Sequence, residues 1–116
     1  MNKIYHIVER SYWEENSNQK EYFSSNFEVE NFIHASIAEQ LNATANRYYK
    51  AHQEIVVLII DLSKLVSTIK FELSLSLQQD FPHIYGPINL DAVEEIAYCR
   101  KDKDDDWDFD YMIRHS

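Results

Sequence analysis

The sequence predicts an α+β fold in which a compact, split β-sheet dominates and one main helix covers it. The nearly continuous apolar run Glu54–Leu62 is typical of a central strand that is buried on both faces. Apolar and polar residues alternate over Ile69–Leu77, as in a strand with two different faces. Only the segment from Ser36 to about Lys50 carries extended helical periodicity, and 116 residues suit a single domain over 1–116.

The remaining elements follow from residue type and spacing. The segment "IYHIV" is rich in β-branched and aromatic residues and predicts a first strand. We expect a short helix from near Ser11 and two further strands, at Phe32–Ala35 and Ala92–Arg100.

The main helix has a predicted beginning and two distinct stripes. Ser36 followed by Glu39 has the form of a capping box, so Ser36 is expected to cap the helix. One face is apolar and contains Ile37, Leu41, Ala45 and Tyr48. The neighbouring stripe is mostly polar and contains Ser36, Gln40, Ala43 and Arg47.

The stretch "FPHIYGPIN", Phe81 to Asn89, holds the only glycine and both prolines of the chain. Pro82 favours an extended residue before it, and Pro87 blocks continuation as an inner strand. Gly86 permits a positive φ or a close approach of the backbone to a ligand. We therefore expect a rigid extended segment that presents His83 and Tyr85 in one fixed direction.

Composition excludes several functions. A formal net charge of −9 opposes non-specific binding to nucleic acid or to an anionic membrane. A single cysteine excludes an internal disulfide, and the longest apolar run, Ile55–Ile60, is too short to cross a bilayer. We therefore expect a cytoplasmic protein. The acidic segment Lys101–Asp110 is expected to be a solvated turn or edge, since it lacks the glycine of an EF-hand calcium loop.

Three histidines, His6, His34 and His83, lie in segments with strand character. Alternation along a strand places His34 on the same side as Ser36, where strand passes into helix. The same rule places His83 and Tyr85 together. The sequence thus predicts that His34, Ser36, His83 and Tyr85 line one cleft.

Several motifs occur in a characteristic order: "IYHI", "FIHAS", "ANRYY", "VVLIIDL" and "FPHIYGPINLDAV". In this combination the chain resembles the domain-of-unknown-function family 952, small bacterial proteins, from about Ile4 to Arg100. Two departures are visible. Asn31 stands where the family often has glycine, and Ala35 stands where it often has cysteine.

The resemblance implies an ADP-ribosyltransferase-like fold, a split sheet with a cleft between its halves. On this basis we assign catalytic roles to His34, Glu72 and His83, and ligand-binding roles to His6, Ser36, Gln40, Arg47 and Tyr85. NAD, as cofactor or substrate, or an ADP-ribose-type ligand is the candidate occupant. Arg47 would face a phosphate, Tyr85 would stack on a flat ring, and Glu72 would stabilise positive charge at the ribose carbon.

Two other hypotheses remain open. Three histidines with an open position suit catalytic zinc, and His6, His34 and His83 would form such a site. No short-range ligand pattern marks it, so no metal ligand is assigned. The other hypothesis is a non-enzymatic interaction or regulatory domain. Both an enzyme and a binding protein agree with the sequence, and so does any oligomeric state.

Overall fold

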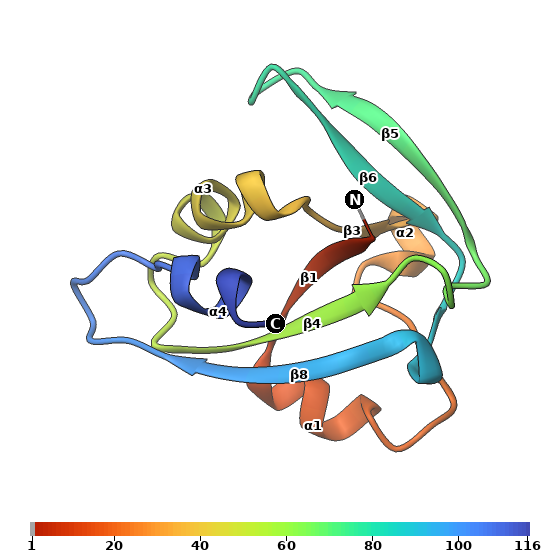
Figure 1. Cartoon of the computed structure of the whole chain (residues 1–116), viewed down its shortest axis with the longest axis horizontal. Helices are drawn as coiled ribbons and strands as arrows, with labels where there is room; N and C mark the ends of the chain where they lie inside the picture. Colours follow the sequence, from red (N-terminus) through yellow and green to blue (C-terminus); the bar gives the residue numbers. More distant parts are fainter. Residues whose placement is uncertain (1) are drawn as a thin grey trace.

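The central sheet consists of three antiparallel strands, β1 (Lys3–Glu9), β4 (Glu54–Asp61) and β8 (Val93–Arg100), in the order β1-β4-β8 (Figure 1). The computed structural model describes residues 2–116. Residues Ile55–Ile60 of the middle strand are at most 1% exposed. This confirms the fully buried central strand that the apolar run predicts.

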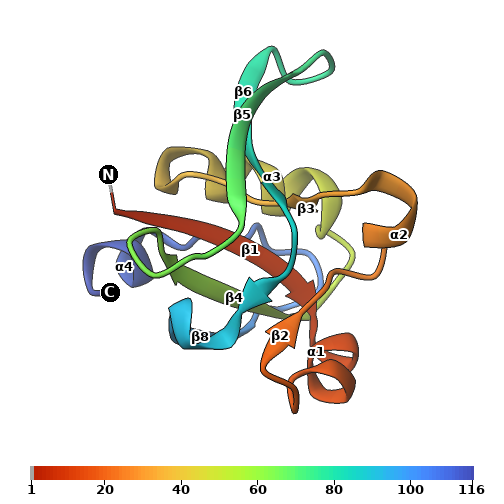
Figure 2. The ribbon, with the colours of Figure 1, turned by 90° about the vertical axis from the view of Figure 1, so that its right-hand side faces the viewer.

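A second three-stranded sheet lies across the first, with the order β3 (Ile33–His34), β6 (Gln79–Tyr85), β5 (Thr68–Ser74). A short ladder also joins β2 (Glu21–Tyr22) to β7 (Ile88–Asn89). The far end of the β5–β6 hairpin projects away from the central sheet (Figure 2). The result is a mixed α/β structure with several small antiparallel sheets, as expected at the level of fold class.

The helices are few and mostly short: α1 (Arg10–Asn16), α2 (Phe27–Glu30), α3 (Ala38–Tyr48), the 3-10 helix η1 (Leu90–Ala92) and α4 (Asp110–Arg114). The predicted main helix is α3. None of the helices within residues 2–116 combines the length and the apolar character needed to span a membrane.

The beginning of α3 differs from the prediction by one residue. Ile37, not Ser36, is the N-cap position, and its backbone N–H donates to Gln40 Oε1 at 3.1 Å. Gln40 therefore makes the return contact expected of Glu39. Ser36 remains part of the extended chain, because its backbone exchanges two hydrogen bonds of 2.8 Å with Tyr5 of β1.

Alternate residues of β4 enter two separate cores. Val56, Leu58 and Ile60 pack in the core that also contains Trp13 and Tyr22. Ile55, Val57 and Ile59 pack against the face covered by α3, in the core that also contains Leu41 and Ala45. An apolar run without alternation is the consequence of burial on both faces.

The C-terminal segment corrects the prediction of a simple solvated turn. Its aspartates are exposed, but Trp107 and Phe109 are each only 4% exposed and their rings stack with centroids 5.7 Å apart. Asn46 of α3 donates to the Trp107 carbonyl at 2.9 Å and accepts from the Trp107 N–H at 2.6 Å. Local sequence could not reveal this, because the acidic residues on either side dominate the pattern.

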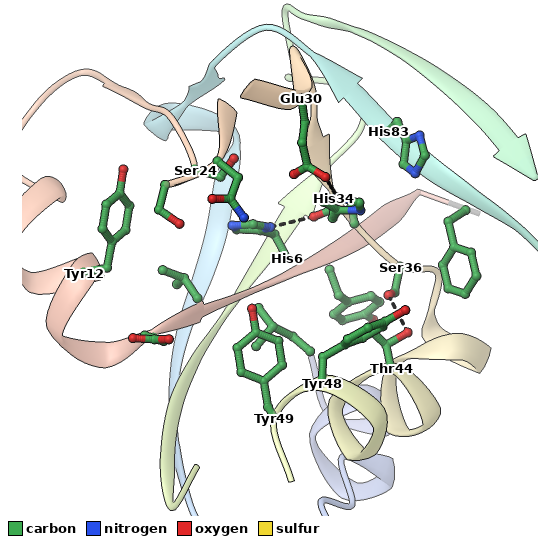
Figure 3. Close-up of a pocket in the computed structure, with 18 of the residues that line it drawn as sticks. His6, Tyr12, Ser24, Glu30, His34, Ser36, Thr44, Tyr48, Tyr49 and His83 are labelled. Atoms are coloured by element: carbon green, nitrogen blue, oxygen red, sulfur yellow. Dashed lines mark hydrogen bonds and ion pairs between the residues drawn. The ribbon is translucent and has the colours of Figure 1, made fainter. Parts of the chain in front are cut away.

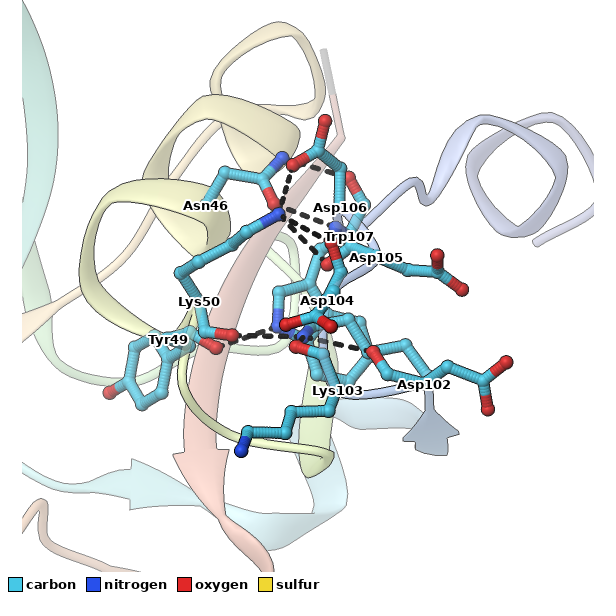
Figure 4. A network of polar contacts seen from close by, with 10 residues as sticks. Asn46, Tyr49, Lys50, Asp102, Lys103, Asp104, Asp105, Asp106 and Trp107 are labelled. Carbon is cyan, nitrogen blue, oxygen red and sulfur yellow. Dashed lines mark hydrogen bonds and ion pairs between the residues drawn. The ribbon is translucent and has the colours of Figure 1, made fainter.

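Two lysines, Lys50 and Lys101, hold the acidic turn, and Figure 4 shows the contacts of Lys50. Lys50 Nζ donates to the Asp105 carbonyl at 2.9 Å and pairs with the Asp106 carboxylate. Lys101 Nζ donates to the carbonyls of Lys50, at 2.9 Å, and Lys103, at 3.2 Å. The segment is thus tied to α3 by carbonyl contacts as well as by charge.

The predicted strand Ile69–Leu77 is shorter than expected. The strand ends at Ser74, and a turn follows. Phe71, Leu73 and Leu75 are 48%, 58% and 78% exposed. At the base of the hairpin Ile69 packs against the first core, but the part beyond it extends past the central sheet (Figure 2), and its apolar side chains are therefore exposed. Glu72 and Ser74 on the polar face are half-buried.

Candidate functional site

A cavity of about 750 Å³ lies between β1, β3, β6 and α3, and the segment around residues 22–30 closes one side (Figure 3). Its wall is rich in tyrosine, histidine and hydroxyl groups. The lining side chains that matter for chemistry are Glu9, Tyr12, Tyr22, Ser24, Glu30, His34, Ser36, Thr44, Tyr48, Tyr49, His52 and His83, with His6 behind them.

His6 is a buried brace between strands. His6 is only 5% exposed, and its Nδ1 lies 2.6 Å from the His34 carbonyl oxygen. A carbonyl only accepts, so Nδ1 carries the proton and Nε2 accepts from the Tyr22 hydroxyl at 3.0 Å. Burial lowers the pKa of His6 to about 4. Both nitrogens are therefore occupied within the protein, and the ring is neutral at pH 7.

His34 is held more loosely at the edge of the cavity. Its Nε2 lies 3.0 Å from Glu30 Oε2, one helical turn earlier in the chain, and 61% of the side chain is exposed. The carboxylate accepts, so Nδ1 is the unprotonated nitrogen of the neutral ring. Unlike His6, His34 keeps a nitrogen without a protein partner among the described residues.

His83 is held by Glu72 at one nitrogen and by Phe32 on one face of its ring. Its Nδ1 lies 2.8 Å from Glu72 Oε1, and the Tyr85 hydroxyl donates to the same oxygen at 2.5 Å. Phe32 stacks on the imidazole, with ring centroids 4.0 Å apart and planes at 17°. The Tyr85 hydroxyl, and after it the His83 imidazole, lower the pKa of the Glu72 carboxyl. An ionised carboxylate thus lies at the back of His83.

One wall of the cavity presents hydroxyl groups from α3 and the strand before it. Ser36 Oγ donates to Thr44 Oγ1 at 3.3 Å, and Tyr48 lies beside this pair (Figure 3). Burial raises the pKa of Tyr49, so its hydroxyl stays protonated at neutral pH. These groups can donate or accept hydrogen bonds without carrying charge.

The opposite end of the cavity contains a pair that the sequence did not suggest. His52 Nε2 lies 3.2 Å from Glu9 Oε1, across 43 positions of sequence. His52 Nδ1 is buried and has no hydrogen-bond partner among residues 2–116. The polar surroundings of His52 suggest a surface residue, and Tyr48 and Tyr49 resemble packing residues. No local signal connects His52 with Glu9, because the two residues meet only where the loop after α3 comes close to the end of β1.

The predicted site residues divide into two groups. His6, His34, Ser36 and His83 line the cavity, whereas Gln40, Arg47, Glu72 and Tyr85 do not. Of the four residues predicted to share one cleft, Tyr85 is therefore the one that lies outside the wall. His34 and His83 do share a face, with ring centroids 5.3 Å apart.

The residues outside the wall have identifiable contacts. Gln40 Nε2 donates to the Asp80 carbonyl at 2.8 Å and so joins α3 to β6. Glu72 and Tyr85 form the hydrogen-bonded group behind His83. Arg47 is exposed, and its guanidinium lies 5.6 Å from the centre of the Tyr48 ring. No side chain of Lys or Arg lines the cavity in the part of the chain described, whereas two carboxylates do.

Gly86 ends β6 with a φ of +145°, which confirms the positive φ that the sequence allows. A Cβ at this position would lie 2.5 Å from Ser67 Oγ. Ser67 Oγ in turn donates to the Pro87 carbonyl at 2.6 Å. Gly86 therefore serves a tight backbone turn directly after Tyr85.

The alternative of a three-histidine metal site is not supported by the geometry. Over residues 2–116, no three His, Cys, Asp or Glu side chains are grouped so that they could hold a metal ion. His6 could join such a site only by giving up a buried hydrogen bond.

Comparison with known proteins places the chain among relatives without an assigned function. A family model described as "Protein of unknown function (DUF952)" matches residues 7–96. The crystal structure of protein CC0527 from Caulobacter crescentus is similar, with 26% identity, a TM-score of 0.84 and coverage of 97% of this chain and 98% of that one.

The solution NMR structure of the same Caulobacter protein is 30% identical, with a TM-score of 0.70 and coverage of 95% and 90% of the two chains. A search of curated proteins gave no match. The family match spans well over half of the chain, and the chain therefore belongs to the DUF952 family of proteins of unknown function.

Proposed function

We propose that this protein binds a small molecule of the nucleoside type in the cavity, with NAD and ADP-ribose as the larger members of the same ligand class. The observation that carries the proposal is the wall itself. Tyrosine rings, hydroxyl groups and the two carboxylates Glu9 and Glu30 surround a space of about 750 Å³. Small-molecule sites usually enclose about 300–1,000 Å³ and combine aromatic surface with a few polar groups.

Each feature of the wall matches part of a nucleoside. A flat base can lie against a tyrosine ring, and Tyr12, Tyr48 and Tyr49 are available. A carboxylate can accept from ribose hydroxyls, as acidic residues do in dinucleotide-binding folds. Glu9 and Glu30 each use one oxygen on a histidine and keep the second oxygen for a ligand.

Phosphate groups are expected to contribute little. Guanidinium and ammonium groups are the usual phosphate partners, and neither type lines the cavity among the described residues. The resemblance implies a phosphate contact for Arg47, but Arg47 lies outside the cavity wall, and in this proposal the histidines at the cavity edge contact any phosphate instead. In this proposal a diphosphate would extend past His34 toward solvent.

As part of the same proposal, residues 1–116 form a single domain with an ADP-ribosyltransferase-like split sheet. It is supported by the two three-stranded sheets, which border the cavity through β1 on one side and through β3 and β6 on the other. The likeness concerns architecture, and the ligand is argued from the cavity alone.

Calorimetric titration tests the proposal with a graded series: adenosine, nicotinamide riboside, AMP, ADP-ribose and NAD. We expect the nucleosides to bind within about threefold of the nucleotides, because the described part of the cavity wall has no Lys or Arg side chain to bind the phosphates. Glu30→Gln should weaken binding by about tenfold, the usual effect of losing a charged hydrogen-bond acceptor. The Val29→Ala variant is the matched control, since Val29 is 84% exposed beside Glu30.

Absence of binding by every member of the series at millimolar concentration would refute the proposal. Tight binding of ADP-ribose with no binding of adenosine would refute the assignment to nucleosides and would restore a phosphate-directed site. Equal binding by wild type and Glu30→Gln would leave Glu9 as the carboxylate to test next, with Glu9→Gln expected to show the tenfold loss.

A further inference from the structure

Glu72, His83 and Tyr85 form a hydrogen-bonded group on the polar face of the β5–β6 hairpin. Strand pairing places Lys70 opposite His83 and Glu72 opposite Phe81, so Glu72 lies diagonally across from His83. Glu72 Oε1 accepts from His83 Nδ1 at 2.8 Å and from the Tyr85 hydroxyl at 2.5 Å. Because a carboxylate cannot donate, the neutral His83 ring carries its proton on Nδ1. Its Nε2 is then an unprotonated acceptor.

The orientation of this ring is restricted on its other sides. Phe32 stacks on one face at 4.0 Å, and His34 meets the ring edge-on at 5.3 Å between centroids. The His83 side chain is 14% exposed and borders the cavity. An imidazole held at Nδ1 by a carboxylate, with Nε2 free beside a cavity, is the arrangement that makes histidine an effective general base.

We infer that His83 is the proton-accepting group of this cavity, with Glu72 as its positioning residue, and that the reaction it serves is hydrolysis of an acyl ester. This inference rests on the proposed function, because the ester would be borne by a hydroxyl of the nucleoside-type ligand. Tyr85 acts through Glu72, which it holds in place. The resemblance implies a catalytic role for both Glu72 and His83, and the inference gives these two residues different roles.

A water molecule gives one proton to His83 Nε2 while its oxygen bonds to the ester carbonyl carbon. The bond from that carbon to the alcohol oxygen then breaks, and the imidazolium returns the proton to the departing alcohol. Glu72 stabilises the positive charge that His83 carries between the two transfers.

The class of ester follows from the charges around the cavity. Phosphate esters place several negative charges on the reacting group and need cations to hold them. Among the described residues the cavity wall contributes Glu9 and Glu30 but no Lys or Arg. An uncharged acyl group suits this wall better than a phosphoryl group does.

Hydrolysis of para-nitrophenyl acetate, followed by release of nitrophenolate, tests the inference on the intact protein. We expect His83→Ala to lower kcat/KM by about a hundredfold, in the range of general-base catalysis. Glu72→Gln keeps an oxygen for Nδ1–H but removes the charge, and should lower kcat by about tenfold with little change in KM. Val66→Ala is the control and should leave the rate unchanged, since Val66 is 83% exposed and is not part of the cavity wall.

Nitrogen NMR of the imidazole rings provides a readout that a purely structural role would not move. In the wild type, the neutral His83 ring should show a protonated Nδ1 and a bare Nε2, whereas Glu72→Ala should give a mixture of tautomers. The inference is overturned by a protonated Nε2 in the wild type. It is also overturned by a wild-type rate no greater than that of free imidazole, or by a rate that His34→Ala abolishes and His83→Ala does not.

The two proposals can fail separately. Nucleoside binding without ester hydrolysis would overturn the role of His83 and leave the binding proposal intact. Hydrolysis that depends on His83, in a protein that binds no nucleoside, would retain the base and refute the ligand class.

Discussion

His6 and His83 border the same cavity, yet the protein uses them in opposite ways. His6 lies on β1 of the central sheet, where both of its nitrogens are bonded to protein groups and its pKa is lowered to about 4 by burial. His83 lies on β6, where one nitrogen is bonded to Glu72 and the other has no partner among the described residues.

The difference comes from packing around the two strands. β1 pairs with β4 along its whole length, and Ser36 bonds to the backbone of Tyr5 at the other edge of β1. The Tyr22 side chain contacts the His6 ring itself. β6 belongs to the hairpin that projects from the body, so one side of His83 remains open to the cavity. A histidine on a strand is thus structural or reactive according to whether tertiary contacts leave a nitrogen free.

The largest expected difference between His6 and His83 is in their contribution to the free energy of unfolding. His6→Ala should lower the free energy of unfolding by about 3 kcal/mol or more, because the His34 carbonyl and the Tyr22 hydroxyl lose their buried partner. His83→Ala, the matched variant, should cost about 1 kcal/mol, because its single bond is to a carboxylate that is 40% exposed. Urea unfolding of both variants measures the difference, and equal losses would contradict it.

Acid should destabilise the protein through His6. The unfolded ring titrates near 6.5 and the folded ring near 4, so between these values the unfolded state binds more protons. The neutral His6 ring therefore contributes its full stabilisation above pH 6.5. The free energy of unfolding should fall by about 3 kcal/mol as the pH decreases to about 4. Urea unfolding at a series of pH values measures this. His6→Gln should flatten the curve over this interval, and an unchanged slope in the variant would show that another group is responsible.

A change at the end of β6 should disturb the His83 side and leave β1 intact. Gly86→Ala should cost about 2 kcal/mol, since alanine is strained at a φ of +145° and its Cβ meets Ser67 Oγ. Adding Ser67→Ala should recover only the part due to the clash. An unchanged denaturant midpoint for Gly86→Ala would mean that the turn can relax at no cost.

The smallest expected effect concerns Arg47. Its guanidinium lies over the Tyr48 ring and outside the cavity wall, so Arg47→Ala should change nucleoside affinity by less than about twofold. Calorimetry with adenosine and NAD measures this beside Glu30→Gln. A tenfold loss for NAD alone would return Arg47 to the phosphate-binding role that the sequence suggested.

Local sequence patterns were sufficient for most of the secondary structure. The predicted strands over Ile4–Val8 and Ala92–Arg100 match β1 and β8 within one residue at each end, because residue type and alternation act over a few neighbours. The same holds for Gly86, where a single residue type satisfies the backbone. Asn31 occupies a left-handed position at φ 66°, a conformation that glycine and asparagine adopt more readily than other residues.

The sequence by itself therefore determined most of the longer strands, the main helix and the family. Tertiary structure alone decided which histidine keeps a free nitrogen. The contacts that decide it join His6 to Tyr22 over 16 positions, His83 to Glu72 over 11 and His52 to Glu9 over 43. Such contacts depend on strand pairing and on burial, and neither quantity is encoded in the residues next to each histidine.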